Sequence, residues 1–249
     1  MCVYDNERVD KVNFDISLIQ KPDGLTFGTD ALLLAAYVFG GYKSGAELGG
    51  GSGIISLLLL SREKLKSAVC YEIQEEYADL IRRNAEYNNL TERLVTVCAD
   101  VRSIRSDEDC DLVFTNPPYM KSDSGKGNKL EKKAIARHEI HGGISDFCEA
   151  AKRKLKYGGA FYAVYRPDRL ADIISAMRDN SLEPKRMTFV HADTESEPSM
   201  VLIEAKRGGR CGMTLTRPLI IYADKEHKCY SDDMEYIMEN GSFPSYYKR

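Results

Sequence analysis

The sequence predicts an α/β protein with a mostly parallel seven-stranded sheet, helices on both faces and an antiparallel hairpin at the end of the sheet. Two observations support this fold class. From residue 45 onward, short apolar runs typical of strands alternate with stretches typical of helices, which is the pattern of parallel βαβ units. At residues 186–205 the alternation stops, because two strand-like runs follow each other with no room for a helix between them.

The predicted strands are short and apolar. They lie at residues 46–48, 68–73, 94–99, 111–115, 160–165, 186–191 and 200–205, with helices at 54–63, 74–88, 145–157 and 167–180. Ser145 is the expected N-cap of the third helix, Gly158 and Gly159 should end it, and Pro167 should open the fourth. Parallel neighbours need a connection of a dozen or more residues, so the last two strands should form an antiparallel hairpin.

Three regions are expected along the chain: an N-terminal extension at residues 1–44, a core domain at 45–207 and a C-terminal tail at 208–249. The extension should contain a strand at 14–20, a turn at 22–24 and a helix ending near residue 39, with Thr29 or Asp30 as its cap. The tail is basic and glycine-rich at its start. One further strand is expected within 215–222, followed from Ser231 by a short helix or disorder.

The composition favours a globular intracellular protein. The chain has 249 residues, 43% of them hydrophobic, and a net charge of −3, which argues against a histone-like binder. No apolar run approaches the roughly 18–20 residues that cross a bilayer, and no secretion signal is recognisable. Cys70, Cys98 and Cys148 should be reduced and buried, as in a cytoplasmic protein. Only His138 and His141 lie close together among the histidines, so no metal site is expected.

A glycine-rich turn follows the first strand of the core. Residues 47–53 read Glu-Leu-Gly-Gly-Gly-Ser-Gly and lead into a helix. Gly49, Gly51 and Gly53 permit positive φ and a close backbone approach to a ligand. The spacing of these glycines differs from the dinucleotide-binding motif Gly-x-Gly-x-x-Gly. Glu47, which precedes them, suits an amino-bearing ligand better than a pyrophosphate. A dinucleotide dehydrogenase is therefore disfavoured.

Acidic residues follow the next two strands. Glu72 ends the second strand, where a carboxylate can accept hydrogen bonds from both hydroxyls of a ribose. Asp100 follows the third strand, where it can accept from the amino group of an adenine. Since ligands bind at the carboxyl ends of strands in such sheets, Glu47, Glu72 and Asp100 should share one site.

The fourth strand ends in Asn116-Pro117-Pro118-Tyr119, a turn suited to a planar –NH₂ group. Both prolines lack a backbone N–H donor, and each disfavours helical backbone in the residue before it. The side-chain oxygen of Asn116 and the carbonyl oxygen of Pro117 can then accept from one amino group, while the ring of Tyr119 stacks on its plane.

A basic stretch comes directly after this turn. Residues 119–141 contain six basic and three acidic side chains, although the whole chain is slightly acidic. Two further basic clusters occur at residues 152–156 and 206–210. Such clusters are either solvated faces or sites for nucleic-acid phosphates.

Taken together, these motifs resemble the S-adenosylmethionine-dependent amino-methyltransferases of the Rossmann-like class I fold. With Ile19-Gln20, residues 27–35 and residues 136–139, the similarity covers roughly residues 10–207 and extends to a bacterial family that methylates adenine N6 in valine tRNA, next to the anticodon. Residues 208–249 match no part of that family.

The resemblance implies S-adenosylmethionine as cofactor and RNA, specifically tRNA, as partner. It implies a role for each site residue. The methionine end would be held by Glu47, Gly49, Gly51, Gly53, Thr29 and Asp30. Glu72 would bind the ribose, and Asp100 and Val101 would bind the adenine. Asn116, Pro117 and Tyr119 would be catalytic, Asn116 also lying against the cofactor, and Lys121, Lys132, Lys133 and Arg137 would bind RNA phosphates.

Two alternatives stay open. Related families with the same tetrapeptide methylate N5 of a glutamine in release factors, or guanine in ribosomal RNA, and an amide –NH₂ suits the same two acceptors. A non-catalytic nucleic-acid-binding module on the same fold is the other alternative. Neither the oligomeric state nor the tRNA base follows from the sequence.

Overall fold

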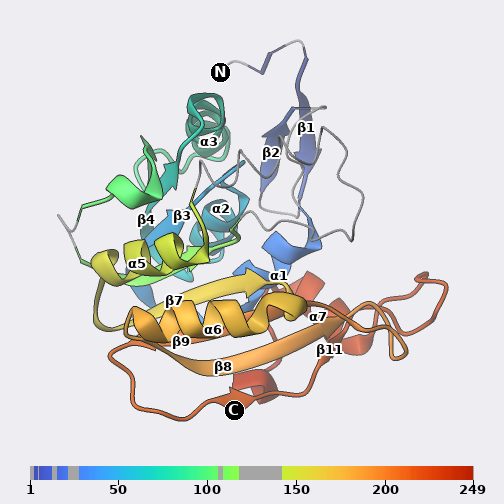
Figure 1. Cartoon of the computed structure of the whole chain (residues 1–249). Coiled ribbons are helices and arrows are strands. Elements are labelled where there is room, and N and C mark those ends of the chain that lie inside the picture. The colour runs from blue at the N-terminus through green and yellow to red at the C-terminus, as the bar shows by residue number, and fades with distance from the viewer. Residues whose placement is uncertain are drawn as a thin grey trace, which may run out of the picture.

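The computed structural model describes residues 3–4, 6–12, 16–21, 28–105, 109–117 and 142–248 (Figure 1). Its centre is a mostly parallel sheet with helices on both faces, as the sequence predicts. Seven strands form the body of the sheet: β3 (Tyr42–Leu48), β4 (Leu65–Glu72), β5 (Leu94–Cys98), β6 (Cys110–Thr115), β7 (Leu155–Tyr165), β8 (Leu182–His191) and β9 (Pro198–Arg207).

The spatial order of these strands is β8-β9-β7-β6-β3-β4-β5. All neighbouring pairs are parallel except that β9 runs antiparallel to both β7 and β8. The predicted terminal hairpin is thus confirmed, with longer strands than the apolar runs indicate. The strand order reverses between β3 and β6, and ligands bind at such a switch point in open α/β sheets.

The strand count differs from the prediction, because within the described residues the sheet has nine strands rather than seven. The additional strands, β10 (Thr214–Leu215) and β11 (Leu219–Ile220), each pair in parallel with β8. They replace the single strand expected within residues 215–222. Each is only two residues long, and pairing with the edge of β8 decides its conformation, which no local pattern reveals.

The helices divide between the two faces according to their buried residues. One face is covered by α1 (Thr29–Tyr37), α2 (Ile54–Ser61), α3 (Glu75–Tyr87) and α7 (Asp232–Asn240), and the other by α5 (Ile144–Lys154) and α6 (Leu170–Asp179). Short 3-10 turns are η1 (Val101–Ser103), η2 (Pro167–Arg169) and η3 (Ser245–Lys248). In Figure 1, α5 and α6 lie on the same side of the sheet.

Four predicted helix boundaries are wrong. The N-cap of α5 is Gly143, whose N–H donates to the Asp146 carboxylate at 2.8 Å, so Ser145 lies inside the helix. The helix ends at Lys154 and the chain enters β7 at once, which places Gly158 and Gly159 within the strand.

At the other boundaries, Pro167 opens η2 instead of α6. The N-cap of α1 is Gly28, so Thr29 and Asp30 both belong to the first turn of that helix. The burial of one cysteine is also wrong: Cys70 and Cys148 are buried, but Cys98 is exposed at the end of β5.

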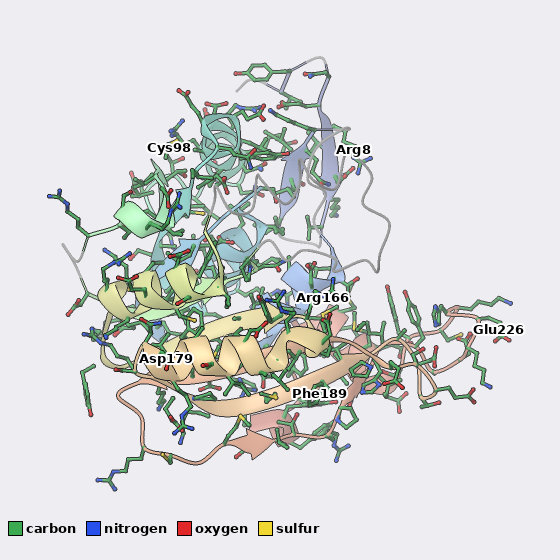
Figure 2. All side chains as sticks on the ribbon, in the orientation of Figure 1. Arg8, Cys98, Arg166, Asp179, Phe189 and Glu226 are labelled. Atoms are coloured by element: carbon green, nitrogen blue, oxygen red, sulfur yellow. The ribbon has the colours of Figure 1, made fainter. Side chains whose placement is uncertain are left out.

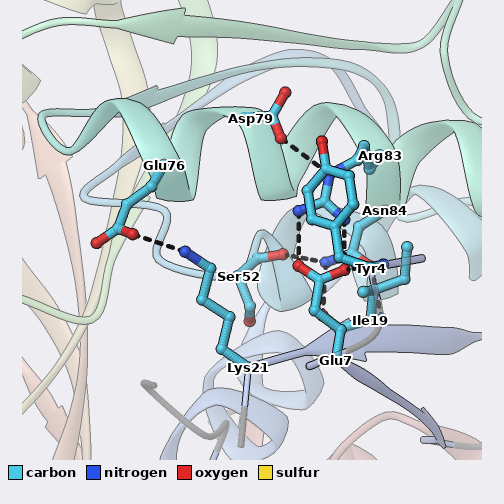
Figure 3. A network of polar contacts seen from close by, with 9 residues as sticks. All are labelled: Tyr4, Glu7, Ile19, Lys21, Ser52, Glu76, Asp79, Arg83 and Asn84. Carbon is cyan, nitrogen blue, oxygen red and sulfur yellow. Dashed lines mark hydrogen bonds and ion pairs between the residues drawn. The ribbon is translucent and has the colours of Figure 1, made fainter. Parts of the chain in front are cut away.

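The N-terminal residues form a separate two-stranded antiparallel sheet, β1 (Arg8–Lys11) with β2 (Ser17–Gln20). Asn84 of α3 fastens it to the core: its side chain accepts from Ile19 N at 2.7 Å and donates to Ile19 O and Ser52 O (Figure 3). Glu7 adds a two-bond ion pair with Arg83. The N-terminal strands are therefore coupled, through α3, to the glycine-rich turn.

Residues after 208 also pack into the core. Leu219, Ile237, Phe243 and Tyr247 are buried in the hydrophobic cluster that contains α1 and α2. Beside them, the guanidinium of Arg186 stacks on the Tyr37 ring and donates to the backbone oxygens of residues 37 and 247, at 3.0 and 3.2 Å. The C-terminal segment thus completes one face of the sheet. No helix within the described parts of the chain is long and apolar enough to cross a membrane.

Candidate active site at the carboxyl edge of the sheet

Four of the predicted motifs meet at one edge of the sheet. The parallel strands β3, β4, β5 and β6 end at residues 48, 72, 98 and 115, and the glycine turn, Glu72, Asp100 and Asn116 lie at or directly after those ends. In Figure 2, Arg166, which follows β7, lies at this carboxyl edge, and Asp179, which ends α6, lies at the opposite edge. The predicted residues thus gather where parallel α/β sheets bind their ligands.

The glycine turn has the left-handed backbone that its sequence predicts. Gly49, Gly51 and Gly53 have φ of +72°, +56° and +80°. The N–H groups of Gly49 and Gly50 both donate to Tyr71 O, at 2.9 and 3.1 Å, which ties the turn to the end of β4. A Cβ added at Gly51 would meet no atom within 4 Å, so this part of the turn borders open space that a ligand can approach.

Gly50 is needed for a different reason. A Cβ at this position would overlap the Sγ of Cys70 and lie 3.0 Å from a methyl group of Ile81. Cys70 is completely buried in β4. This middle glycine of the three therefore lets the turn lie directly on β4 and α3.

Glu47 lies beneath the turn, only 1% exposed. Its carboxylate accepts from Ser56 Oγ at 2.5 Å and Ser56 N at 3.2 Å, and from Cys70 Sγ at 3.5 Å. Burial raises its pKa to about 7. Since Ser56 is in the first turn of α2, these contacts attach the start of that helix to β3. They are protein contacts, and the role of Glu47 toward the methionine end stays a prediction.

Glu72 is fixed by the backbone around it. Its Oε2 accepts from Gly51 N and its Oε1 from Gln74 N, both at 2.9 Å. Each carboxylate oxygen keeps a second lone pair, which is what a pair of ribose hydroxyls requires. The residue is 5% exposed and lies against the open part of the glycine turn, so its surroundings fit the predicted role.

Asp100 has a partner that the sequence analysis does not include. Its carboxylate caps η1 by accepting from Arg102 N at 2.8 Å, and it forms an ion pair with the Arg102 guanidinium at 2.5 Å. Val101 is buried beside it. An adenine amino group would share the Asp100 oxygens with Arg102. The separation of two residues is the signal that could have indicated this pair.

Asn116 is held in place from both sides. Before it, Thr115 Oγ1 donates to Leu48 O at 2.7 Å and joins the ends of β6 and β3. The Asn116 side chain itself donates from Nδ2 to Asp30 Oδ2 at 2.8 Å. The family resemblance implies that Asp30 lies at the methionine end, and no sequence pattern indicates this contact, because the two residues lie on separate elements.

The remaining predicted residues divide into two groups. Thr29 is exposed at the start of α1, and Pro117 is buried directly after Asn116. Outside the described residues lie Tyr119, Lys121, Lys132, Lys133 and Arg137. Among the described residues, no group of His, Cys, Asp and Glu side chains could hold a metal ion.

The strand order, the glycine turn after β3 and the acid at the end of β4 define a class I Rossmann-like methyltransferase. Residues 23–178 match the family model described as the methyltransferase small domain, and the chain belongs to that family. It is an S-adenosylmethionine-dependent methyltransferase, and the open glycine turn with Glu72 beside it fits this cofactor.

Curated relatives share a common name. The chain is 27% identical over 202 residues to a "tRNA1(Val) (adenine(37)-N6)-methyltransferase" from Porphyromonas gingivalis, which covers 77% of each chain. It is 28% identical to the protein of that name from Aeromonas hydrophila, over 73% of this chain and 76% of the relative.

Solved structures share the fold. A predicted O-methyltransferase from Agrobacterium tumefaciens superimposes with a TM-score of 0.69 and 24% identity, covering 86% of this chain and 98% of that one. A methyltransferase from Pyrococcus furiosus gives a TM-score of 0.56 and 20% identity, over 79% and 91% of the two chains.

Proposed function

We propose that this protein methylates the exocyclic N6 amino group of an adenine in tRNA, at position 37, which its relatives' name specifies. The main support is the placement of Asn116. It follows β6 and lies next to the glycine turn, with its amide held by Asp30. The two curated relatives described above, similar over 77% and 76% of their own length, supply the choice of adenine and tRNA.

S-adenosylmethionine supplies an electrophilic methyl group on a sulfonium. The adenine amino group is a weak nucleophile, because its lone pair is delocalised into the ring. Asn116 Oδ1 and the Pro117 carbonyl oxygen accept hydrogen bonds from its two N–H groups. This favours a pyramidal nitrogen with its lone pair directed at the methyl group. Both contacts strengthen as positive charge develops on nitrogen, so they lower the barrier more than they strengthen ground-state binding.

As the N–C bond forms, the methyl–sulfur bond breaks and a neutral thioether leaves. No base is required before methyl transfer, because the N–H becomes acidic only once nitrogen carries positive charge; the proton then passes to solvent water. Removing one acceptor of this kind costs about 2.7–4 kcal/mol of barrier, or roughly 10²–10³ in rate. Asn116→Ala is therefore expected to lower the turnover number by that factor.

RNA binding is assigned to the basic stretch after the tetrapeptide. Lys121, Lys132, Lys133 and Arg137 would contact phosphates, and Tyr119 would stack on an adenine turned out of its loop. Contacts to several phosphates make affinity fall steeply with salt concentration.

The other two basic clusters provide a matched control. Residues 152–156 and 206–210 lie where β7 begins and β9 ends, which is the edge opposite the site. A hydrogen bond of 3.1 Å from the Tyr157 hydroxyl to Gly208 O joins them. Lys132→Glu/Lys133→Glu should weaken tRNA binding and reduce its salt dependence. Lys206→Glu/Arg210→Glu should not impair methylation.

The experiment incubates the protein with radiolabelled S-adenosylmethionine and either bulk tRNA or release factor, followed by mass spectrometry of the products. The proposal predicts N6-methyladenosine in tRNA and no labelled release factor. Labelled glutamine in the release factor, with unlabelled tRNA, would replace this function with protein methylation. Cofactor binding by calorimetry without methylation of either would favour the binding-module alternative.

A further inference from the structure

The amide of Asn116 is held by a carboxylate in a way that selects one of its two orientations. Asn116 Nδ2 donates to Asp30 Oδ2 at 2.8 Å. Asp30 is itself fixed in the first turn of α1, where its Oδ1 accepts from Ala31 N at 2.9 Å. A Cβ at Gly28 would lie 2.5 Å from that Oδ1, so the glycine before the helix leaves room for the carboxylate.

The two ends of an asparagine amide are nearly identical in shape but opposite in hydrogen-bonding character. Only the oxygen can accept from a substrate amino group, and only the NH₂ group can donate. An ionised carboxylate has acceptors and no donor, so it can bond only to the NH₂ end. With Nδ2 held by Asp30, Oδ1 is turned to the other side of the amide, where it is available as an acceptor.

We propose that Asp30 is a positioning residue for methyl transfer, which sets the orientation of the Asn116 amide. This inference rests on the proposed role of Asn116 as acceptor for the substrate nitrogen. The same contact polarises the amide, because a charge-assisted hydrogen bond at Nδ2 increases the negative character of Oδ1. Asp30 therefore acts through Asn116 and is distinct from a ligand for the methionine carboxylate, the role that resemblance to the family implies.

The two roles make different kinetic predictions, and two isosteric changes separate them. Asp30→Asn removes the charge and lets either amide donate to the other. The Asn116 oxygen can then turn toward position 30 and away from the substrate. We expect a turnover number about 10–100-fold lower at saturating cofactor, with the cofactor dissociation constant changed less than about 2-fold. Asn116→Asp places two carboxylates together and should lower turnover at least as far.

The double variant D30N/N116D exchanges the amide and the carboxylate. Position 30 then donates to position 116, whose second oxygen can accept from the substrate. Turnover should rise well above that of either single variant, since the pair is complementary again. Asp232→Asn is the control, because Asp232 also lies in the first turn of a helix, α7, is exposed, and takes part in none of the hydrogen bonds or ion pairs described for the site. It should leave turnover unchanged.

An independent readout is the side-chain amide resonance of Asn116 in nuclear magnetic resonance spectra, identified by its loss in Asn116→Ala. It should shift in Asp30→Asn and stay unchanged in Asp232→Asn. The inference is overturned if the resonance does not move, if Asp30→Asn weakens cofactor binding while turnover is preserved, or if the double variant is no better than the poorer single one. If the substrate proves to be a glutamine amide, the adenine assignment fails, but the same variants still test Asp30 on that –NH₂ group.

Discussion

Gly50→Ala should destabilise the protein through contact with one atom, the sulfur of Cys70. The backbone at Gly50 does not have the positive φ of its neighbours, so alanine is not excluded by conformation. Its Cβ, however, would overlap Cys70 Sγ and press on Ile81. Overpacking of this kind costs about 1–3 kcal/mol, and the fully buried position of Cys70 suggests a loss near the upper limit, about 3 kcal/mol.

Removing the sulfur should remove most of that cost. With Cys70→Ala, the nearest atom of residue 70 would be its Cβ at 3.9 Å, an ordinary van der Waals contact. In that background Gly50→Ala should cost less than about 1 kcal/mol, giving a coupling energy of roughly 2 kcal/mol. Urea unfolding of the wild type, the two single variants and the double variant measures this coupling energy. Calorimetry measures cofactor binding by the same four proteins, because displacement of Gly50 would move the glycine turn.

Gly51→Ala is the matched control. Gly51 has φ +56° with no atom within 4 Å of an added Cβ, so its cost of about 1–2 kcal/mol comes from the backbone alone. That cost should be the same with cysteine or alanine at position 70. Equal destabilisation by Gly50→Ala in both backgrounds would refute the packing argument.

Three further predictions concern buried polar groups. The pKa of Glu47 in the folded protein is about 7, above its ordinary 4.5, so the folded protein retains a proton that the unfolded chain has lost. The free energy of unfolding should therefore fall as the pH rises from 4.5 to 7. Glu47→Gln should remove this fall, as measured by urea unfolding at a series of pH values. Burial lowers the pKa of Lys64 from 10.5 to about 7, so wild-type stability should rise between pH 7 and 10.5, and Lys64→Met should lack this rise in the same assay. Asn84→Ala leaves the buried Ile19 N–H without its acceptor and should cost about 1–3 kcal/mol by urea unfolding, with faster hydrogen exchange at Ile19; unchanged exchange would contradict its role in anchoring β2.

The parallel core was predictable because its strands are buried on both faces. Such strands leave continuous apolar runs, as at residues 111–115 and 160–165, and polar residues follow where they end. The β8–β9 hairpin was predictable from the length of its connection. The end of α5 was not predictable, because Gly158 and Gly159 mimic a helix terminus, while pairing of Leu155 with Cys110 of β6 extends the strand back to Leu155.

The same division holds for the site. Glu72, Asp100 and the glycine turn could be placed at the carboxyl edge, because their positions follow from where strands end. Side-chain partners could not be predicted, because they depend on tertiary packing. Asp30 and Asn116 are 86 residues apart and meet only when the start of α1 lies at the end of β6. The fit of Gly50 over Cys70 is likewise a contact between two elements that no sequence motif records.

The most direct test of the account is single-turnover methylation of tRNA by Asn116→Ala at saturating S-adenosylmethionine, with cofactor binding measured in parallel. The account predicts that the rate of methyl transfer to adenine N6 falls by about 10²–10³, far more than the affinity for the cofactor falls. Transfer at the wild-type rate would contradict the assignment of Asn116 as an acceptor for the substrate nitrogen.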